Sequence, residues 1–148
     1  MSGLGGLTAD SQGSISQSYA VGRVMDSEYS VAGGLVGGSE KESTITQSYS
    51  TTALKDIGHR NRETGGLIGV DDSPAGSNTS DYWDTTTSKI KNLRHGAGTP
   101  KNDPGITGLT TAELQSGLPA GFDPTIWAES PKINNGLPYL IANPPRKD

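Results

Sequence analysis

Gly33-Gly34-Leu35-Val36-Gly37 is the stretch of this 148-residue sequence from which the fold can be argued. The motif recurs upstream as Gly5-Gly6-Leu7 and downstream as Gly65-Gly66-Leu67-Ile68-Gly69. The copies begin at residues 5, 33 and 65, so they are spaced by 28 and 32 residues. Self-similarity at a fixed period of about 20–50 residues is the sequence signature of repeat proteins. The sequence therefore predicts three copies of one structural unit.

A second motif accompanies the glycine pairs at nearly the same phase. Ile15-Ser16-Gln17-Ser18-Tyr19 matches Ile45-Thr46-Gln47-Ser48-Tyr49, and Asn78-Thr79-Ser80-Asp81-Tyr82 is a looser third copy. In the first copy the larger side chains alternate with serines, which is the period-2 pattern of a half-buried strand. The repeat residues on which the structural prediction rests are Gly33, Gly34, Leu35, Gly65, Gly66, Leu67, Tyr19, Tyr49 and Tyr82.

Stacking of these units is the expected architecture. A unit of about 30 residues with short strands cannot bury its own apolar face, whereas stacked units share a continuous core. We therefore predict an all-β fold, a short parallel β-helix (β-solenoid) of about three coils, over residues 1–88. Each glycine pair would form a tight corner or let neighbouring backbones pass closely. The third copy departs from the pattern after Gly69, which fits a terminal, capping repeat.

Composition leaves one alternative to this fold open. The sequence is only 30% hydrophobic and contains 21 glycines, a composition that disordered chains share. The regular recurrence of the apolar residues favours the folded alternative.

Residues 89–148 are expected to form a separate loop, short helix and C-terminal cap. Residues 94–108 are rich in Gly and Pro and predict an irregular loop. Thr110 followed by Glu113 is a capping box, which predicts a short helix over about Thr111–Gln115. Asn135-Gly136 indicates a turn, and Pro138 indicates an edge strand.

The C-terminal segment is also richer in aromatic and large apolar residues than the repeats. We expect these residues to cover the open end of the stack, because an uncovered end exposes unpaired backbone groups and invites aggregation. Trp83 and Trp127 are interpreted as anchors of the core or cap. The alternative is that they form a platform on which carbohydrate rings stack.

The pairing of Gly-Gly-Leu-Val-Gly with Ile-Thr-Gln-Ser-Tyr-Ser resembles the GLUG-motif repeats of bacterial surface proteins. These include filamentous-haemagglutinin-like adhesins and autotransporter passengers, and similar repeats flank some secreted immunoglobulin A peptidases. The resemblance implies a non-catalytic structural or adhesive segment of a secreted, cell-surface exoprotein. Its implied partners are flanking repeats of the parent chain and a host-surface protein, matrix protein or glycan. The alternatives are a repeat region accessory to a secreted peptidase or polysaccharide-active enzyme, and a carbohydrate-binding module.

Charge and composition argue against several other classes of function. The formal net charge is −4 and the basic residues form no run or stripe, so nucleic-acid binding is not expected. The sequence has no cysteine, which rules out disulfides and thiolate metal sites. No stretch approaches the ~20 apolar residues of a membrane span, so membrane insertion is not expected.

Few residues suggest catalysis or metal binding, and no enzyme activity, cofactor or metal is expected. His59 and His95 lie in polar or glycine-rich stretches and are interpreted as solvated loop residues. Asp71-Asp72, with Asp81 and Asp84 downstream, could serve acid–base chemistry or bind calcium. The pattern lacks the spacing of known calcium loops, and turn formation next to Ser73-Pro74 is the favoured interpretation. Self-cleavage at the Asp-Pro bonds is the weakest alternative.

Overall fold

The computed structural model describes residues 2–25, 30–55 and 63–146, and it is an all-β protein with few helices. The first repeat contributes β1 (Ser2–Gly5), β2 (Thr8–Ser11), β3 (Ser14–Ser16), β4 (Tyr19–Ala20) and β5 (Arg23–Met25). The second contributes β6 (Ser30–Gly33), β7 (Val36–Ser39), β8 (Thr44–Thr46), β9 (Tyr49–Ser50) and β10 (Ala53–Lys55). The third contributes β11 (Thr64–Gly65), β12 (Ile68–Asp71), β13 (Asn78–Thr79), β14 (Asp81–Asp84) and the helix α1 (Thr85–Ser88). The remainder contains β15 (Ala97–Thr99), β16 (Ile106–Leu109), α2 (Thr111–Leu114), β17 (Trp127–Ala128), the 3₁₀ turn η1 (Asn134–Gly136) and β18 (Tyr139–Leu140).

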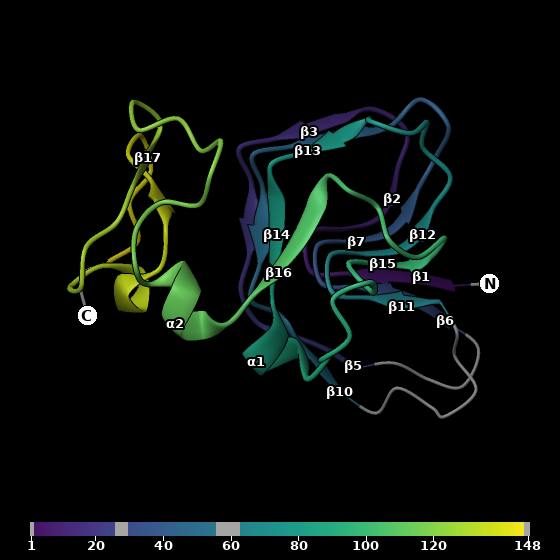
Figure 1. Cartoon of the computed structure of the whole chain (residues 1–148), viewed down its shortest axis with the longest axis horizontal. Coiled ribbons are helices and arrows are strands. Elements are labelled where there is room, and N and C mark those ends of the chain that lie inside the picture. The colour runs from purple at the N-terminus through teal and green to yellow at the C-terminus, as the bar shows by residue number, and fades with distance from the viewer. Residues whose placement is uncertain (1, 26–29, 56–62, 147–148) are drawn as a thin grey trace.

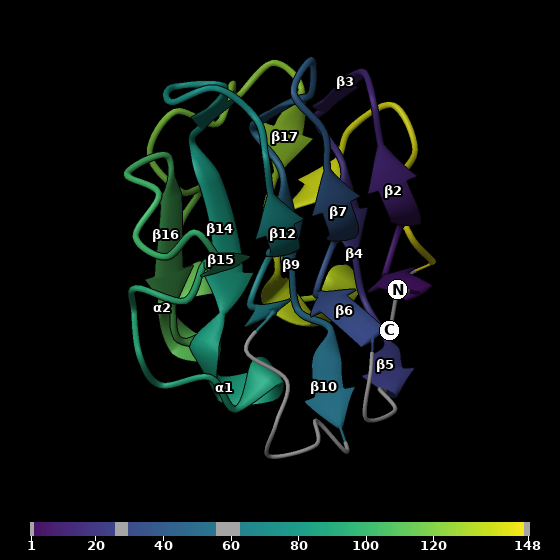
Figure 2. The ribbon, with the colours of Figure 1, turned by 90° about the vertical axis from the view of Figure 1, so that its right-hand side faces the viewer.

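Corresponding strands of successive repeats lie side by side and pair in parallel. The sheets have the orders β1-β6-β11, β2-β7-β12-β15, β3-β8-β13, β4-β9-β14-β16 and β5-β10. The register matches the sequence repeats, because Tyr19 lies opposite Tyr49 and Tyr49 lies opposite Tyr82. Figure 1 shows the repeats overlaid on one another, and Figure 2 shows β2, β7 and β12 side by side. The predicted all-β class with parallel strand pairing is confirmed.

The two glycines of each pair have different structural roles. A Cβ on Gly33 would lie 1.8 Å from the carbonyl oxygen of Val36 in the same repeat, because the chain turns tightly between β6 and β7. A Cβ on Gly34 would instead lie 2.1 Å from the carbonyl oxygen of Gly66 in the next repeat. Glycine is therefore required once by the turn and once by the neighbouring row, and both predicted reasons for the pair apply.

The stretch predicted as one alternating strand, Ile15–Tyr19, is interrupted. β3 ends at Ser16 and β4 begins at Tyr19, with Gln17 between them at φ 48°. Gln47 repeats this left-handed conformation at φ 48°, and Ser80 does so at φ 57°. A single left-handed residue turns the chain, so the expectation of a continuous strand was wrong and the motif marks a corner.

The core lies between the sheets and is built from columns of equivalent residues. Leu35 and Leu67 are each 0% exposed, and the backbone N–H of Leu35 donates to the carbonyl oxygen of Leu67 at 2.9 Å. Ile45 and Trp83 are also fully buried in this cluster. Leu7 belongs to the same column but is 50% exposed, because it lies in the first row.

Parallel pairing continues beyond Ser88, where the sequence predicted a boundary and an irregular loop. β15 pairs in parallel with β12, and β16 pairs in parallel with β14. Residues 94–108 are therefore not one irregular loop but contain strands of a partial fourth row. A second difference from prediction is α1, which begins after Asp84. Asp84 accepts hydrogen bonds from the backbone N–H groups of Thr86 and Thr87 and so caps this extra helix.

The C-terminal segment contains the predicted capping box. Thr110 caps α2, and its side chain and that of Glu113 satisfy each other's backbone N–H groups. β17 and β18 pair antiparallel, and the predicted Asn-Gly turn is present as η1. The segment packs against the flank that contains β4, β9 and β14 (Figure 1). The expectation that it covers the open end of the stack was therefore wrong.

Candidate functional site

A column of tyrosines forms the most distinctive surface that the repeats present to the C-terminal segment. Tyr19 and Tyr49 stack with ring centroids 5.3 Å apart and an interplanar angle of 3°. Successive side chains of a strand point to opposite faces, and so Tyr82 faces this flank while its neighbour Trp83 enters the core. The predicted tyrosines are therefore brought together, on the outside of the sheet rather than in the core between the sheets.

Polar contacts fix the C-terminal segment on this column. The Tyr49 hydroxyl donates to the carbonyl oxygen of Pro138 at 2.5 Å, and the Asn134 amide donates to the Tyr49 hydroxyl at 3.1 Å. The Tyr82 hydroxyl donates to the carbonyl oxygen of Ala120 at 2.7 Å. Burial raises the pKa of Tyr49 far above its usual value of 10, so the hydroxyl stays protonated and remains a donor.

Two aromatic residues of the C-terminal segment complete the contact. The rings of Phe122 and Trp127 stack with centroids 4.6 Å apart. Phe122 meets Tyr82 edge-on at 5.7 Å, and Trp127 lies 5.9 Å from both Tyr19 and Tyr49. Aromatic pairs at these separations contribute about 0.5–1.5 kcal/mol each beyond the area they bury. The segment is thus attached to all three repeats by one aromatic cluster.

The two tryptophans are both enclosed, Trp83 at 0% and Trp127 at 1% exposed. Trp83 fills the space beside Gly66, where a Cβ would lie 2.1 Å from the indole ring. A ring on which a sugar stacks must present a free face to solvent, and neither indole does. Their burial favours the interpretation as core and cap anchors over the carbohydrate platform.

The serine of the Gln-Ser-Tyr motif joins adjacent rows at the corner. The Ser48 hydroxyl oxygen accepts a hydrogen bond from the backbone N–H of Ser18 at 3.1 Å. One row further, Asp81 Oδ1 accepts from the backbone N–H of Ser48 at 2.9 Å. Burial raises the pKa of Asp81 to about 8, although two backbone N–H groups favour the ionised form. The sequence did not reveal that this position joins adjacent rows. The available signal was that Ser18, Ser48 and Asp81 occupy the same position of successive repeats.

Asp71 is buried, and its carboxylate accepts hydrogen bonds from Ser73 and Asn78. Its Oδ1 accepts from the N–H of Ser73 at 3.1 Å, as the predicted Asp turn requires. The Asn78 amide donates to Asp71 and to Asp103, at 2.8 Å in each case. Burial, with the nearby Asp103 carboxyl, raises the pKa of Asp71. Asp72 is exposed.

The described carboxylates and His95 do not gather into a cluster of metal ligands. Within residues 2–25, 30–55 and 63–146, no group of three or more His, Cys, Asp or Glu side chains is arranged to hold a metal ion. Burial and the nearby charges of Lys101 and Arg94 lower the pKa of His95. The prediction for His59 lies outside the described residues. No helix in the described part of the chain is long and apolar enough to cross a membrane.

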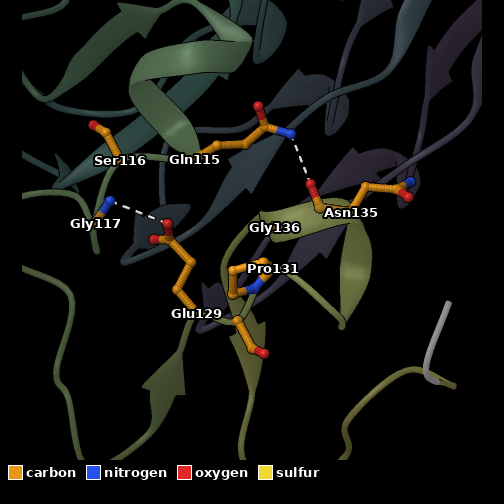
Figure 3. A pocket seen from close by; sticks show the side chains of 8 residues that line it. Gln115, Ser116, Gly117, Glu129, Pro131, Asn135 and Gly136 are labelled. Atoms are coloured by element: carbon orange, nitrogen blue, oxygen red, sulfur yellow. Dashed lines mark hydrogen bonds between the residues drawn. The ribbon is translucent and has the colours of Figure 1, made fainter.

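A cavity of about 610 Å³ lies within the C-terminal segment (Figure 3). Gln115 donates to the carbonyl oxygen of Asn135 at 2.6 Å across it, and Glu129 accepts from the N–H of Gly117 at 3.0 Å. Burial raises the pKa of Glu129. Glu129 is the single titratable residue among those that line this cavity.

Comparison with known proteins adds no relative: no family model, no curated protein and no solved structure matches the chain.

Proposed function

We propose that the repeats form a short β-solenoid and that this chain is a non-catalytic structural segment of a large secreted bacterial surface protein of the adhesin type. The observation that carries the proposal is that each of the main sheets takes one strand from each successive repeat, in parallel and in register. Such an arrangement extends in one direction by adding rows, which suits a stalk or spacer.

The chemistry of the described residues is consistent with this role. The most conspicuous repeat residues are used for packing, turning and joining rows: the glycine pairs, Leu35, Leu67 and the tyrosine column. The cavity of the C-terminal segment is lined by one carboxylate, that of Glu129, among otherwise uncharged residues. The resemblance of the motifs to GLUG repeats supplies the cellular setting, and attachment to a host surface belongs to that parent protein.

Surface labelling tests the location. An antibody raised against the folded chain is applied to intact and to lysed cells of the organism that encodes it. Labelling of intact cells is expected, and protease treatment of those cells should remove it. Labelling that appears only after lysis would refute a surface location.

Assays of the purified chain test the structural role. We expect no hydrolysis of peptide, ester or glycoside substrates. A reproducible turnover that Glu129→Gln abolishes, and that Glu113→Gln at an exposed position of α2 leaves intact, would refute the non-catalytic assignment.

A further inference from the structure

Among the described residues, no strand pairs with the outer side of the first repeat, and this side is called the open edge. β1, β2, β3, β4 and β5 each stand last in their sheets, all at the same end (Figure 2). The column that buries Leu35 and Leu67 completely leaves Leu7 half exposed at this edge. Edge strands of this kind accept further strands unless they are covered or charged.

At the leucine of the Gly-Gly-Leu motif and at the serine corner, the hydrogen bonds between rows run from each row to the one that follows it in the chain. The N–H of Leu7 donates to Leu35 O at 2.9 Å, and the N–H of Leu35 donates to Leu67 O at 2.9 Å. At the corner the N–H of Ser18 donates to the side chain of Ser48. A row added before the first repeat would donate in the same direction. Its acceptors at the open edge would be the carbonyl oxygen of Leu7 and the hydroxyl oxygen of Ser18. Ser18 already has the matching orientation, because its hydroxyl donates to the carbonyl oxygen of Ser16, as that of Ser48 does to Thr46.

A steric rule restricts what can be added. A Cβ on Gly6 would lie 2.4 Å from Gly34 O, and a Cβ on Gly34 would lie 2.1 Å from Gly66 O. A row added at the open edge in the same register has this relation to Gly6 O, so its residue over Gly6 must also be glycine. The equivalent position in the fourth row is His95, whose carbonyl oxygen accepts from the N–H of Gly66 at 2.8 Å. A second copy therefore cannot place its fourth row on this edge in the same register, because the histidine Cβ would meet the carbonyl oxygen of Gly6.

We propose that the open edge of the first repeat is a docking surface for a further Gly-Gly-Leu repeat segment, which adds as a row of parallel strands. Its second glycine lies over Gly6, and the backbone N–H of its corner residue donates to the Ser18 hydroxyl. The proposal rests on the proposed function, because it takes the stacked row as the unit of addition. It adds the edge at which a repeat docks and the sequence rule by which that repeat is selected.

A peptide with the sequence of residues 30–55 is the probe, because it carries one complete described repeat. It is titrated into the full chain by isothermal calorimetry, and amide hydrogen exchange is measured with and without it. We expect saturable one-to-one binding and slower exchange in residues 2–20, with no change in β15 or β16. The same peptide carrying Gly34→Val should not bind, because its side chain would meet the carbonyl oxygen of Gly6.

Variants of the protein test the hydrogen bond. Ser18→Ala removes the acceptor but keeps the N–H that donates to Ser48, so it should fold and bind the peptide about two- to tenfold more weakly. Ser116→Ala, in the C-terminal segment, should bind as the unaltered chain does.

Equal binding of the Gly34→Val peptide would overturn the proposal, and so would slower exchange at β15 and β16 instead of the first repeat. Absence of binding by a folded chain would also overturn it, as would self-association through the first-repeat edge in sedimentation. Each of these leaves the structural function standing. The structural function is refuted by a different result, which is an equal and small loss of stability on truncation of Leu7, Leu35 and Leu67.

Discussion

Leu35→Ala is the substitution that tests whether the repeats share one core. Leu35 is fully buried. Its row lies between two others, since its carbonyl oxygen accepts from the N–H of Leu7 and its N–H donates to the carbonyl oxygen of Leu67. Burying a leucine side chain contributes about 1.5–3 kcal/mol, and the cavity left by truncation adds to the loss. The expected decrease in the free energy of unfolding is therefore ~2–5 kcal/mol.

Leu7→Ala is the matched control, since it changes the same residue type in the same column. Leu7 is 50% exposed, so it buries about half as much area, and solvent fills the space that truncation leaves. We expect a loss of about 1 kcal/mol or less. Leu67→Ala should resemble Leu35→Ala, because Leu67 is fully buried and the fourth row covers it.

Urea unfolding followed by circular dichroism measures all three variants under the same conditions. With a slope of ~2 kcal/mol/M, a loss of 2–5 kcal/mol lowers the midpoint by about 1–2.5 M. Equal, small losses for the three variants would refute the shared core, because a chain of independent units encloses no copy more than another.

Three further predictions concern the contacts between rows and the C-terminal segment. Tyr49→Phe should lower the free energy of unfolding by about 0.5–1.5 kcal/mol in urea melts, because it removes the hydrogen bond to Pro138 O; an unchanged midpoint would contradict this. Gly34→Ala should cost ~3 kcal/mol or more by the same assay, because its Cβ would meet Gly66 O; a variant as stable as the parent would refute the close approach. Burial raises the pKa of Asp81 to about 8 from an ordinary value near 3.8, so the folded chain keeps a proton that the unfolded chain loses. Stability should therefore fall as pH rises from about 4 to about 8, and replacement of Asp81 by serine, the residue of the preceding row, should flatten this part of the profile; an unchanged slope would contradict it.

The repeats were predictable because the first glycine of each pair is required by the same tight turn in all three repeats. Gly33 and Gly34 are fixed by a turn and by a neighbouring carbonyl, and both constraints are visible as an identical dipeptide. The capping box of Thr110 and Glu113 was equally readable, because both partners are local in the sequence.

The fourth row could not be predicted from its own residues. β15 is Ala97-Gly98-Thr99, which has no apolar alternation, and it is a strand because Ile68 and Val70 of β12 offer it a parallel partner. The extra helix α1 was missed because three threonines follow Asp84, and β-branched residues have low helix propensity. A tertiary partner decides β15, and the cap from Asp84 supports α1 against the low propensity of its threonines.

The position of the C-terminal segment depended on a side-chain direction that the sequence pattern did not reveal. The alternation of Tyr82 with Trp83 shows that one faces the flank and the other the core, but not which. Placing the aromatic residues of the segment at the open end was wrong because the tyrosines of the three repeats already offered them a flank. The corner role of Gln17 was likewise missed, since glutamine gives little local sign of a left-handed conformation.

The contact of the aromatic C-terminal segment with all three tyrosines has a consequence for the order in which the molecule is completed. Phe122 and Trp127 are made after every tyrosine that they cover. During synthesis, Tyr19, Tyr49 and Tyr82 therefore remain uncovered on the growing chain, whatever pairing the earlier strands have already reached. Phe122 and Trp127 therefore fasten repeats that were synthesised before them, and the contact between the segment and the repeats forms only after Trp127 has been made.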